Sequence, residues 1–552
     1  MKKQRRWFGL MKAVGWLALS GVLALLGSIA LSMLSLASEP APAPAAAQWA
    51  ADSATVRVAA GPQYARSGVW QFFWGTHYRA IWNAPVTAPV LRLASPERDS
   101  LVPLRAGGSY QSRTLRMSTA KGHQFVLRSV DKDMSAALPV GWKRNLLQRL
   151  MKDQTSATLP YGAYVAARLA AAAGVYHANP RLVYLPNDPH LGKFRTTYAN
   201  ALYLLEERAE GNQEHKRSFG NSPAIVNSQH LLTMLRKRPN TQVSPRDFLR
   251  ARLLDMWLGD WSRREDQWRW ASFPGSGGTR FRPIPRDRDQ AFFLFDDGAI
   301  TRVLSWFLLK FQSFHATIRL GNVDALTTTA RNLDRTLLAP LNADDFQAEA
   351  DSLQKRLSDV VIDEALKAGP AETRVGIAAY LAPLLRARRG QLAAVAQRYF
   401  EILNAEAWVV GTDKNERFEV TNAGPGRLRV QLLAQRPHRP DSLLSERVYD
   451  RQTTKILNLY GLAGNDTFRI AADAAVGIKV GIYGGLGQNQ VSLHSLPVDK
   501  ESENEPLSDF TLFTNAAPAP DRQAARLATH PDPHPELTAN ALGWVKRYNL
   551  RS

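Results

Sequence analysis

The sequence predicts an α+β protein with an N-terminal transmembrane helix, a two-lobed core and a small C-terminal β domain. Residues 13–37 carry no charge and are long enough to span a bilayer. Up to about residue 211, short β-branched or aromatic runs surround one Ala-rich helix, which is typical of a small α/β lobe. Apolar residues then recur at helical spacing to about residue 407, which predicts a larger helical lobe.

The N-terminal segment predicts export. Residues 1–12 contain five Lys or Arg and no acid, and the uncharged run of residues 13–37 follows. The basic flank is expected to stay inside. The length of the run favours an uncleaved inner-membrane anchor over residues 1–37, with the bulk of the chain in the periplasm. The alternative is a secretory signal cleaved near Ala37, after which the chain is exported.

Composition narrows the function classes. The formal net charge is +21 and there are no cysteines, so disulfides and thiolate metal sites are excluded. The basic residues are spread along the chain, which indicates a solvated surface and no nucleic-acid partner. Envelope proteins or the membrane surface are the expected partners, and the sequence leaves the oligomeric state open.

Changes in composition predict the domain boundaries. Residues 38–52 form a Pro/Ala linker, 53–211 the small α/β lobe and 212–410 the helical lobe, in which a loop is expected at 273–285. Residues 411–515 form a β-rich module, and residues 516–552, rich in Ala, Pro, Asp and His, a flexible tail. The strands expected in the small lobe are 101–104, 114–117, 124–130, 181–185 and 201–206, with a helix over 161–174.

A glycine-rich segment joins the first two of these strands. Gly107 and Gly108 lie in the run Arg105–Ser112, which also contains Gln111. Glycines there would let backbone N–H groups approach a phosphate. A plain hairpin turn is the alternative, and the glycines by themselves favour it.

Two polar stretches of the helical lobe are candidates for chemistry. Residues 255–270 hold four Trp, four carboxylates and three Arg, which fits either a walled site or a structural ion-pair lattice. Asp287 and Asp289 alternate and would point the same way on an extended chain. Two such carboxylates suit Mg²⁺. The alternative is a pair of solvated acids neutralised by Arg286 and Arg288.

These stretches, in this order, resemble the parts of atypical kinases. Residues 258–264 and 287–291 resemble the catalytic and metal loops of the HipA, CotH and secretory-pathway casein kinase group, and more distantly of phosphatidylinositol kinases. Residues 203–207 resemble the strand that joins the two lobes in the CotH type. The resemblance implies a protein-kinase-like core of a small α/β lobe and a large helical lobe.

A closer resemblance covers about residues 64–487. It includes the words AGGSYQSRTLRM, FVLRSVDKD, GDWSRREDQWRW and PIPRDRDQAFF. These look like an uncharacterised kinase-like module of bacterial envelope proteins, which is often found between a metallophosphoesterase domain and an outer-membrane β-barrel. This chain resembles the module without either neighbour.

The kinase resemblance implies a role for each matching position and a use of ATP and Mg²⁺. The nucleotide would be held by the glycine-rich segment, by a cation on the third strand and by the inter-lobe strand. The metal would be held by residues 287–291, here called the acidic loop. The implied nucleotide-binding residues are Gly107, Gly108, Gln111, Arg128 (or, second, Lys132), Glu206 and Glu207, and the implied metal-binding residues are Asp289, Asp287 and Gln267.

The chain departs from the kinase pattern where the chemistry would take place. Ser262 stands at the position of the catalytic aspartate, and Arg264 replaces a histidine. A kinase uses that aspartate to accept the substrate hydroxyl's proton. Asp260 or Asp266 could substitute for it. The pattern therefore favours a non-catalytic binding or scaffold module, with an Mg²⁺-dependent phosphotransferase as the alternative and a metal-dependent hydrolase ranked third.

The C-terminal module contains two glycine-rich turns. Residues 460–468 and 484–491 resemble the turns of calcium-binding β-roll repeats, but Asn489 stands where the second turn would need an acid. We therefore expect β-turns here and no Ca²⁺ site.

Overall fold

The computed structural model describes residues 53–94, 99–107, 112–137, 146–238, 240–494, 509–514, 527–548 and 550, with three isolated positions at 20, 27 and 30. Apart from those three positions, the predicted anchor of residues 1–37 and the linker of residues 38–52 lie outside the described residues. Among the helices that are described, none has the length and apolar character needed to cross a bilayer. The prediction of a mixed α+β fold with several sheets is confirmed.

The small lobe is built on a five-stranded antiparallel sheet, which contains the five predicted strands. Its order is β3 (Leu101–Gly107), β4 (Ser112–Thr119), β5 (Gln124–Lys132), β7 (Ala201–Glu207) and β6 (Arg181–Leu185). The Ala-rich helix α5 (Gly162–Ala173) ends at Gly174, whose φ of 72° is in the left-handed region that favours glycine. A short ribbon of β1 (Thr55–Ala59) and β2 (Pro85–Pro89) precedes the sheet.

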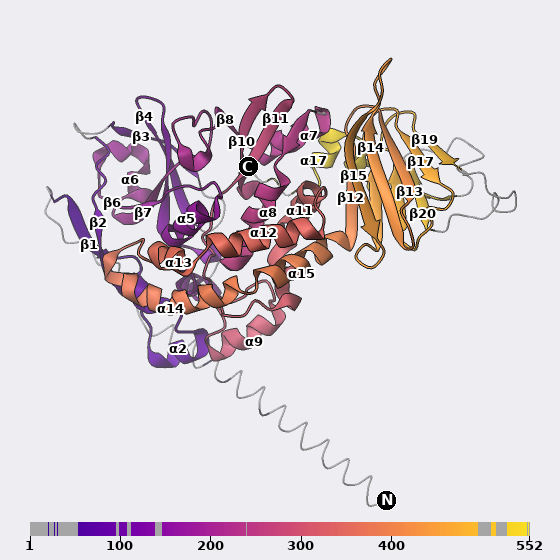
Figure 1. The fold of residues 1–552 in the computed structure, drawn as a ribbon. Coiled ribbons are helices and arrows are strands. Elements are labelled where there is room, and N and C mark those ends of the chain that lie inside the picture. The colour runs from indigo at the N-terminus through magenta and orange to yellow at the C-terminus, as the bar shows by residue number, and fades with distance from the viewer. Residues whose placement is uncertain are drawn as a thin grey trace, which may run out of the picture.

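The helical lobe surrounds α8 (Pro245–Trp257). Nine of the thirteen residues of α8 are buried, so it is the central helix of the lobe. The helices around it are α7 (Ser228–Lys237), α11 (Arg331–Leu338), α12 (Ala343–Arg356), α13 (Asp359–Leu366), α14 (Ala371–Arg389) and α15 (Leu392–Asn404). One apolar core runs from α5 and the small lobe through α8 to these helices (Figure 1).

The loop predicted at residues 273–285 is wrong, because this region forms a hairpin. Strands β10 (Trp268–Gly275) and β11 (Gly278–Pro285) pair antiparallel across a two-residue turn. With β8 (Ala224–Asn227) and β9 (Thr241–Val243) they form a four-stranded sheet within the helical lobe. The sequence pattern hides this sheet because arginines and prolines interrupt the apolar alternation, and because β8 and β9 are only three or four residues long.

The C-terminal β domain stacks successive turns of the chain into two sheets with their own apolar core. One sheet is parallel throughout and contains β12 (Glu406–Val410), β16 (Ile456–Tyr460), β18 (Lys479–Tyr483), β20 (Phe510–Thr514) and β21 (Ala528–Pro531). The other contains β15 (Ser442–Asp450), β14 (Arg427–Ala434), β13 (Glu416–Asn422), β17 (Thr467–Ala471) and β19 (Gln490–His494). Figure 1 shows this domain beside the helical lobe.

The two glycine-rich turns lie one above the other between these sheets. The Asn465 side-chain oxygen accepts a hydrogen bond from the Gln488 backbone N–H at 2.9 Å, and the Asn489 oxygen accepts one from the Asp466 N–H at 3.0 Å. The Asp466 carboxylate in turn accepts from the Glu416 N–H at 2.8 Å. Amide and carboxyl side chains thus satisfy the backbone donors of the neighbouring turn, as is usual for buried donors.

The flexible tail predicted for residues 516–552 is wrong for its second half. Residues 527–548 contain β21, α16 (Pro535–Thr538) and α17 (Ala541–Val545). The fully buried Trp544 packs edge-on against Trp408 at 5.6 Å between ring centroids and donates to the Tyr548 hydroxyl at 2.9 Å. The abundance of Pro, Asp and His suggested a polar tail, but two aromatic residues are sufficient to fix it to the core.

Replacing Trp544 by Ala should destabilise the protein by about 3–5 kcal/mol, the usual cost of removing a buried large aromatic side chain. The matched control is Leu542→Ala on the same helix, whose side chain is exposed and whose loss should change the stability by no more than about 0.5 kcal/mol. Denaturant unfolding followed by tryptophan fluorescence measures both. Equal, small effects would contradict the packed position of α17.

The Asp466 carboxyl should make the β domain less stable as the pH rises. Burial raises its pKa from 3.8 to about 8, and the Glu416 carboxylate adds to the rise. The native state therefore binds the proton more tightly than the unfolded chain, and this stabilisation, complete below pH 3.8, is lost as the pH rises to about 8. Free energies of opening from hydrogen exchange over residues 456–494 should follow this trend.

Asp466→Asn should flatten that pH dependence. Asp473→Asn removes the same charge from an exposed position of the same domain and should leave the slope unchanged. A slope that persists in Asp466→Asn would show that another group causes it.

Candidate functional site

A pocket lies where the small lobe meets the helical lobe. Its walls come from β5, α5, the end of β7 and the loop that follows β11. The cavity has a volume of about 60 Å³. That is far below the roughly 300–1,000 Å³ of ordinary small-molecule sites.

Strand geometry brings two of the predicted residues together in this pocket. Arg128 on β5 pairs in register with Leu204, and Val126 pairs with Glu206, so Arg128 and Glu206 are diagonal neighbours on one face. The Arg128 Nε lies 3.1 Å from a Glu206 carboxylate oxygen. Glu207 also lines the pocket but forms an ion pair with Lys216.

The acidic loop supplies the opposite wall. Asp287 has a φ of 56°, in the left-handed region that Asp tolerates better than most residues. The chain therefore leaves the extended conformation that the sequence predicted for Asp287 and Asp289. Both carboxylates line the same pocket, but they bind different cations. Asp287 forms an ion pair with Arg128, and Asp289 forms one with Lys132.

Mutual neutralisation dominates the electrostatics of the pocket. Burial raises the pKa of Glu206, Arg128 opposes this rise, and Asp287 and Asp289 add to it. Burial would also raise the pKa of Asp287, but the charges of Arg128 and Arg286 hold it below its usual value. One guanidinium therefore serves several carboxylates, and little charge is left for a ligand.

At the edge of the pocket near the start of β4, Asp289 has partners other than Arg128. Asp289 lies 3.3 Å from the Lys132 ammonium, and its carboxylate accepts a hydrogen bond of 3.5 Å from the Ser112 hydroxyl. Ser112 begins β4 directly opposite Lys132, and Gly107 ends β3. Gly108 and Gln111 lie outside the described residues. Lys132, the second choice from the sequence, is therefore the cation that faces Asp289.

The predicted catalytic carboxylates are bound to arginines. Asp260 is buried and accepts from the Ser262 hydroxyl at 2.9 Å and from Arg263 at 3.1 Å. Asp266 pairs with Arg264 at 2.9 Å. Of the two alternatives for residues 255–270, the contacts correspond to the ion-pair lattice.

Gln267 does not join the predicted metal-binding set. Its side-chain oxygen accepts the Arg264 backbone N–H at 2.9 Å, and its backbone oxygen accepts the Arg286 N–H at 3.0 Å. It is not among the residues that line the pocket. Gln267 instead holds the start of β10 against the acidic loop.

Several residues around the site were not identified from the sequence. Asp255 binds Arg263 through two hydrogen bonds of 2.8 and 3.0 Å and Arg288 at 3.0 Å, and Arg252 binds Asp334 of α11 at 2.9 Å. The only signal in the sequence was the density of Asp and Arg in residues 255–270, and nothing there points to Asp334.

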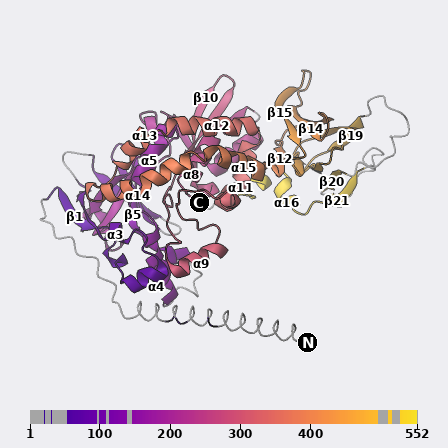
Figure 2. The same ribbon diagram turned by 60° about the horizontal axis from the view of Figure 1, so that its bottom comes forward.

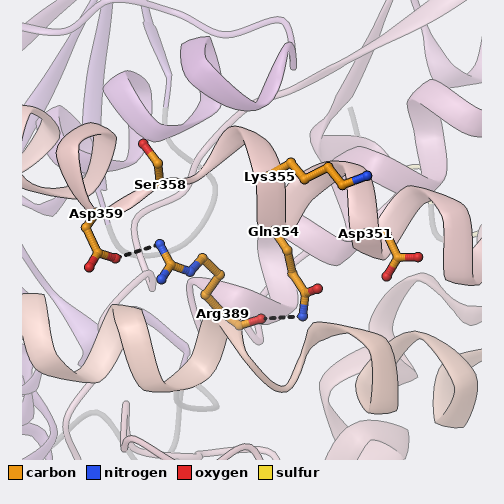
Figure 3. A pocket seen from close by; sticks show the side chains of 6 residues that line it. All are labelled: Asp351, Gln354, Lys355, Ser358, Asp359 and Arg389. Atoms are coloured by element: carbon orange, nitrogen blue, oxygen red, sulfur yellow. Dashed lines mark hydrogen bonds and ion pairs between the residues drawn. The ribbon is translucent and has the colours of Figure 1, made fainter.

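A larger but shallower hollow of about 500 Å³ lies among α12, α13 and α14 (Figure 3). Arg389 closes one side by pairing with Asp359 at 2.7 Å, and Gln354 donates to the Arg389 backbone oxygen at 2.9 Å. Asp351, Lys355 and Ser358 complete the lining. None of these residues belongs to the predicted site.

No protein-family model matches the chain, and no curated protein matches its sequence. Among solved structures, it is similar to the proinflammatory kinase CtkA of Helicobacter pylori over 55% of this chain and 95% of that one, with 12% sequence identity and a TM-score of 0.29.

Replacing Arg263 by Ala should cost about 3–5 kcal/mol of stability, because it leaves buried Asp255 and Asp260 without their shared partner. Arg264→Ala is the matched control. It removes a partly exposed pair with Asp266 and should cost at most about 1 kcal/mol. Denaturant unfolding of the two variants should separate them clearly, and similar costs would contradict a structural role for the lattice.

Proposed function

We propose that the chain is a membrane-tethered envelope protein whose two-lobed, kinase-like module acts as a binding or scaffold component without phosphotransferase activity. The observation that carries this proposal is the ion pairing of the candidate site. Arg128 neutralises Glu206 and Asp287, and Arg263 and Arg264 bind the two carboxylates that could replace the missing catalytic aspartate.

Phosphoryl transfer requires side chains that, in this site, are already bound to other residues. The reaction needs a carboxylate that orients the attacking hydroxyl group and accepts its proton. It also needs metal ions that hold the phosphates. Ser262 occupies the aspartate position, and its hydroxyl donates to Asp260. Asp260 is buried and fixed by Arg263, so it cannot reach a substrate without breaking the lattice.

The kinase-like part of the proposal rests on the arrangement of the two lobes. An antiparallel sheet is joined through β7 to a helix-rich lobe, and the pocket lies at that junction. Tethering rests on the uncharged residues 13–37 behind their basic flank. ATP is scarce outside a bacterial cytoplasm, which also favours a binding role for a module placed in the periplasm.

The alternative is an Mg²⁺- and ATP-dependent phosphotransferase, and one contact favours it. Lys132 and Asp289 face each other under the β3–β4 hairpin, where a lysine could bind a phosphate and an aspartate a metal ion. The Asp289 side chain is one-quarter exposed, so it is accessible from solvent. A nucleotide would still have to separate Arg128 from Asp287, because the present cavity is too small for it.

Thermal unfolding with and without MgATP distinguishes the two functions. We expect no stabilisation of the full chain and no transfer of labelled phosphate from ATP to the chain or to a general acceptor protein. A bound nucleotide at 100 times its Kd would add about 2.7 kcal/mol of stability, which is readily measured.

The alternative would be supported if MgATP stabilised the chain and Asp289→Asn removed that effect. Asp344→Asn, at an exposed position of α12, is the matched control and should keep it. For the proposed binding role, crosslinking in membranes should capture the same partners with Asp289→Asn as with the unchanged chain. Loss of those partners would contradict a role independent of the metal position.

A further inference from the structure

Exposed apolar side chains gather where α2 (Gly68–Trp74) packs against α9 (Ala299–Phe307). We call this surface the aromatic corner. Helices α2 and α9 lie at the lower edge of the larger body in Figure 1. Its members are Val69 and Phe72 of α2, Leu304, Trp306 and Phe307 of α9, and Leu308 and Leu309, which directly follow α9.

This surface differs from the rest of the protein. Among the residues that the structure describes, three Phe or Trp side chains are exposed: Phe72 at 66%, Trp306 at 65% and Phe307 at 77%, and all three lie in the aromatic corner. Single exposed apolar residues are common, but clusters of large ones mark interaction sites. Leu304 and Phe307 are three residues apart and therefore lie on one face of α9.

These side chains face solvent because the space between the helices is already filled by a packed core. Trp70 and Trp74 of α2 are buried with Ile300 of α9 and Leu150 of α4 (Leu146–Asp153), so the inner faces of the helices are already filled. Beyond Leu309, the Lys310 ammonium lies 5.4 Å from the centre of the Trp261 ring. The apolar residues between these fixed points cannot turn inward without displacing a packed core.

Basic residues flank the aromatic corner. Arg149 and Lys152 are exposed on α4, Arg302 is exposed on α9, and Lys310 follows it. Figure 2 shows α4 and α9 along the same edge of the larger body. Of the acids near this edge, Asp153 is buried and pairs with Arg79, while Asp296 and Asp297 bind His315 and His77. The edge therefore combines exposed aromatic rings with a positive margin.

We propose that the aromatic corner rests on the surface of an anionic lipid bilayer. Trp and Phe rings favour the interface between headgroups and acyl chains, and Lys and Arg around them attract anionic lipid. This inference rests on the proposed tether, because the predicted apolar anchor of residues 13–37 would hold the chain at a bilayer.

The absence of cysteine in the sequence permits a site-specific test. Phe307→Cys in the full chain would carry an environment-sensitive fluorophore, and the protein would be added to phosphatidylcholine vesicles with and without phosphatidylglycerol. Val375→Cys on α14 is the control, because that valine is 81% exposed and lies outside the aromatic corner. A nitroxide attached to the lipid chains reports contact with the bilayer, and iodide reports contact with water.

The label at residue 307 should be quenched by the lipid nitroxide and protected from iodide, more strongly with phosphatidylglycerol, while the label at 375 should behave in the opposite way. If the chain sediments with vesicles but both labels stay in water, the proposal is overturned and the tether stands. If the chain does not sediment with vesicles at all, both are overturned. Protection from iodide without lipid quenching, rising with protein concentration, would identify a second copy of the chain as the occupant and would also overturn the proposal.

Discussion

The arrangement of the residues around the inter-lobe pocket depends on the buried carboxylate of Asp255. It is fully buried at the end of α8 and receives hydrogen bonds from Arg263, Arg288 and Arg252. Burial alone would raise its pKa, but Arg263 and then Arg288 hold the pKa at about 2, so the group is charged under all ordinary conditions. An unpaired charge of this kind would be very costly to bury, and therefore the three arginines must come to it.

This requirement fixes the wall of the inter-lobe pocket. Arg263 follows α8, Arg288 lies in the acidic loop after β11, and Arg252 reaches across to Asp334 on α11. The acidic loop is thereby held so that Asp287 meets Arg128 and Asp289 meets Lys132. The same ion pairs that place the carboxylates in the pocket also neutralise them.

The C-terminal β domain and the aromatic corner both lie outside the inter-lobe pocket. Trp544 of α17 packs on Trp408 and Tyr460 of the β domain, and α17 also contacts α7 of the helical lobe, so this short helix joins the two parts. The aromatic corner is formed by α2, which precedes the small-lobe sheet in the chain, and by α9 of the helical lobe. If that corner lies on a bilayer, the inter-lobe pocket and the β domain have a defined orientation relative to the membrane.

Local pattern in the sequence was sufficient for many elements and for only part of the site. The sequence alone determined β6 at Arg181–Leu185 and the end of α5 at Gly174, because a short apolar run with β-branched and aromatic residues and a left-handed glycine are properties of a few neighbouring residues. It also brought Arg128, Glu206, Asp287 and Asp289 into one hypothesis. Only the tertiary structure decided which cation faces which acid, that residues 268–285 pair as a hairpin, and that Trp544 is buried. Those outcomes depend on partners far away in the chain, such as Asp334 for Arg252. The free energy of burying a charge is set by where such partners lie in space. Partners of this kind produce no local periodicity in the sequence.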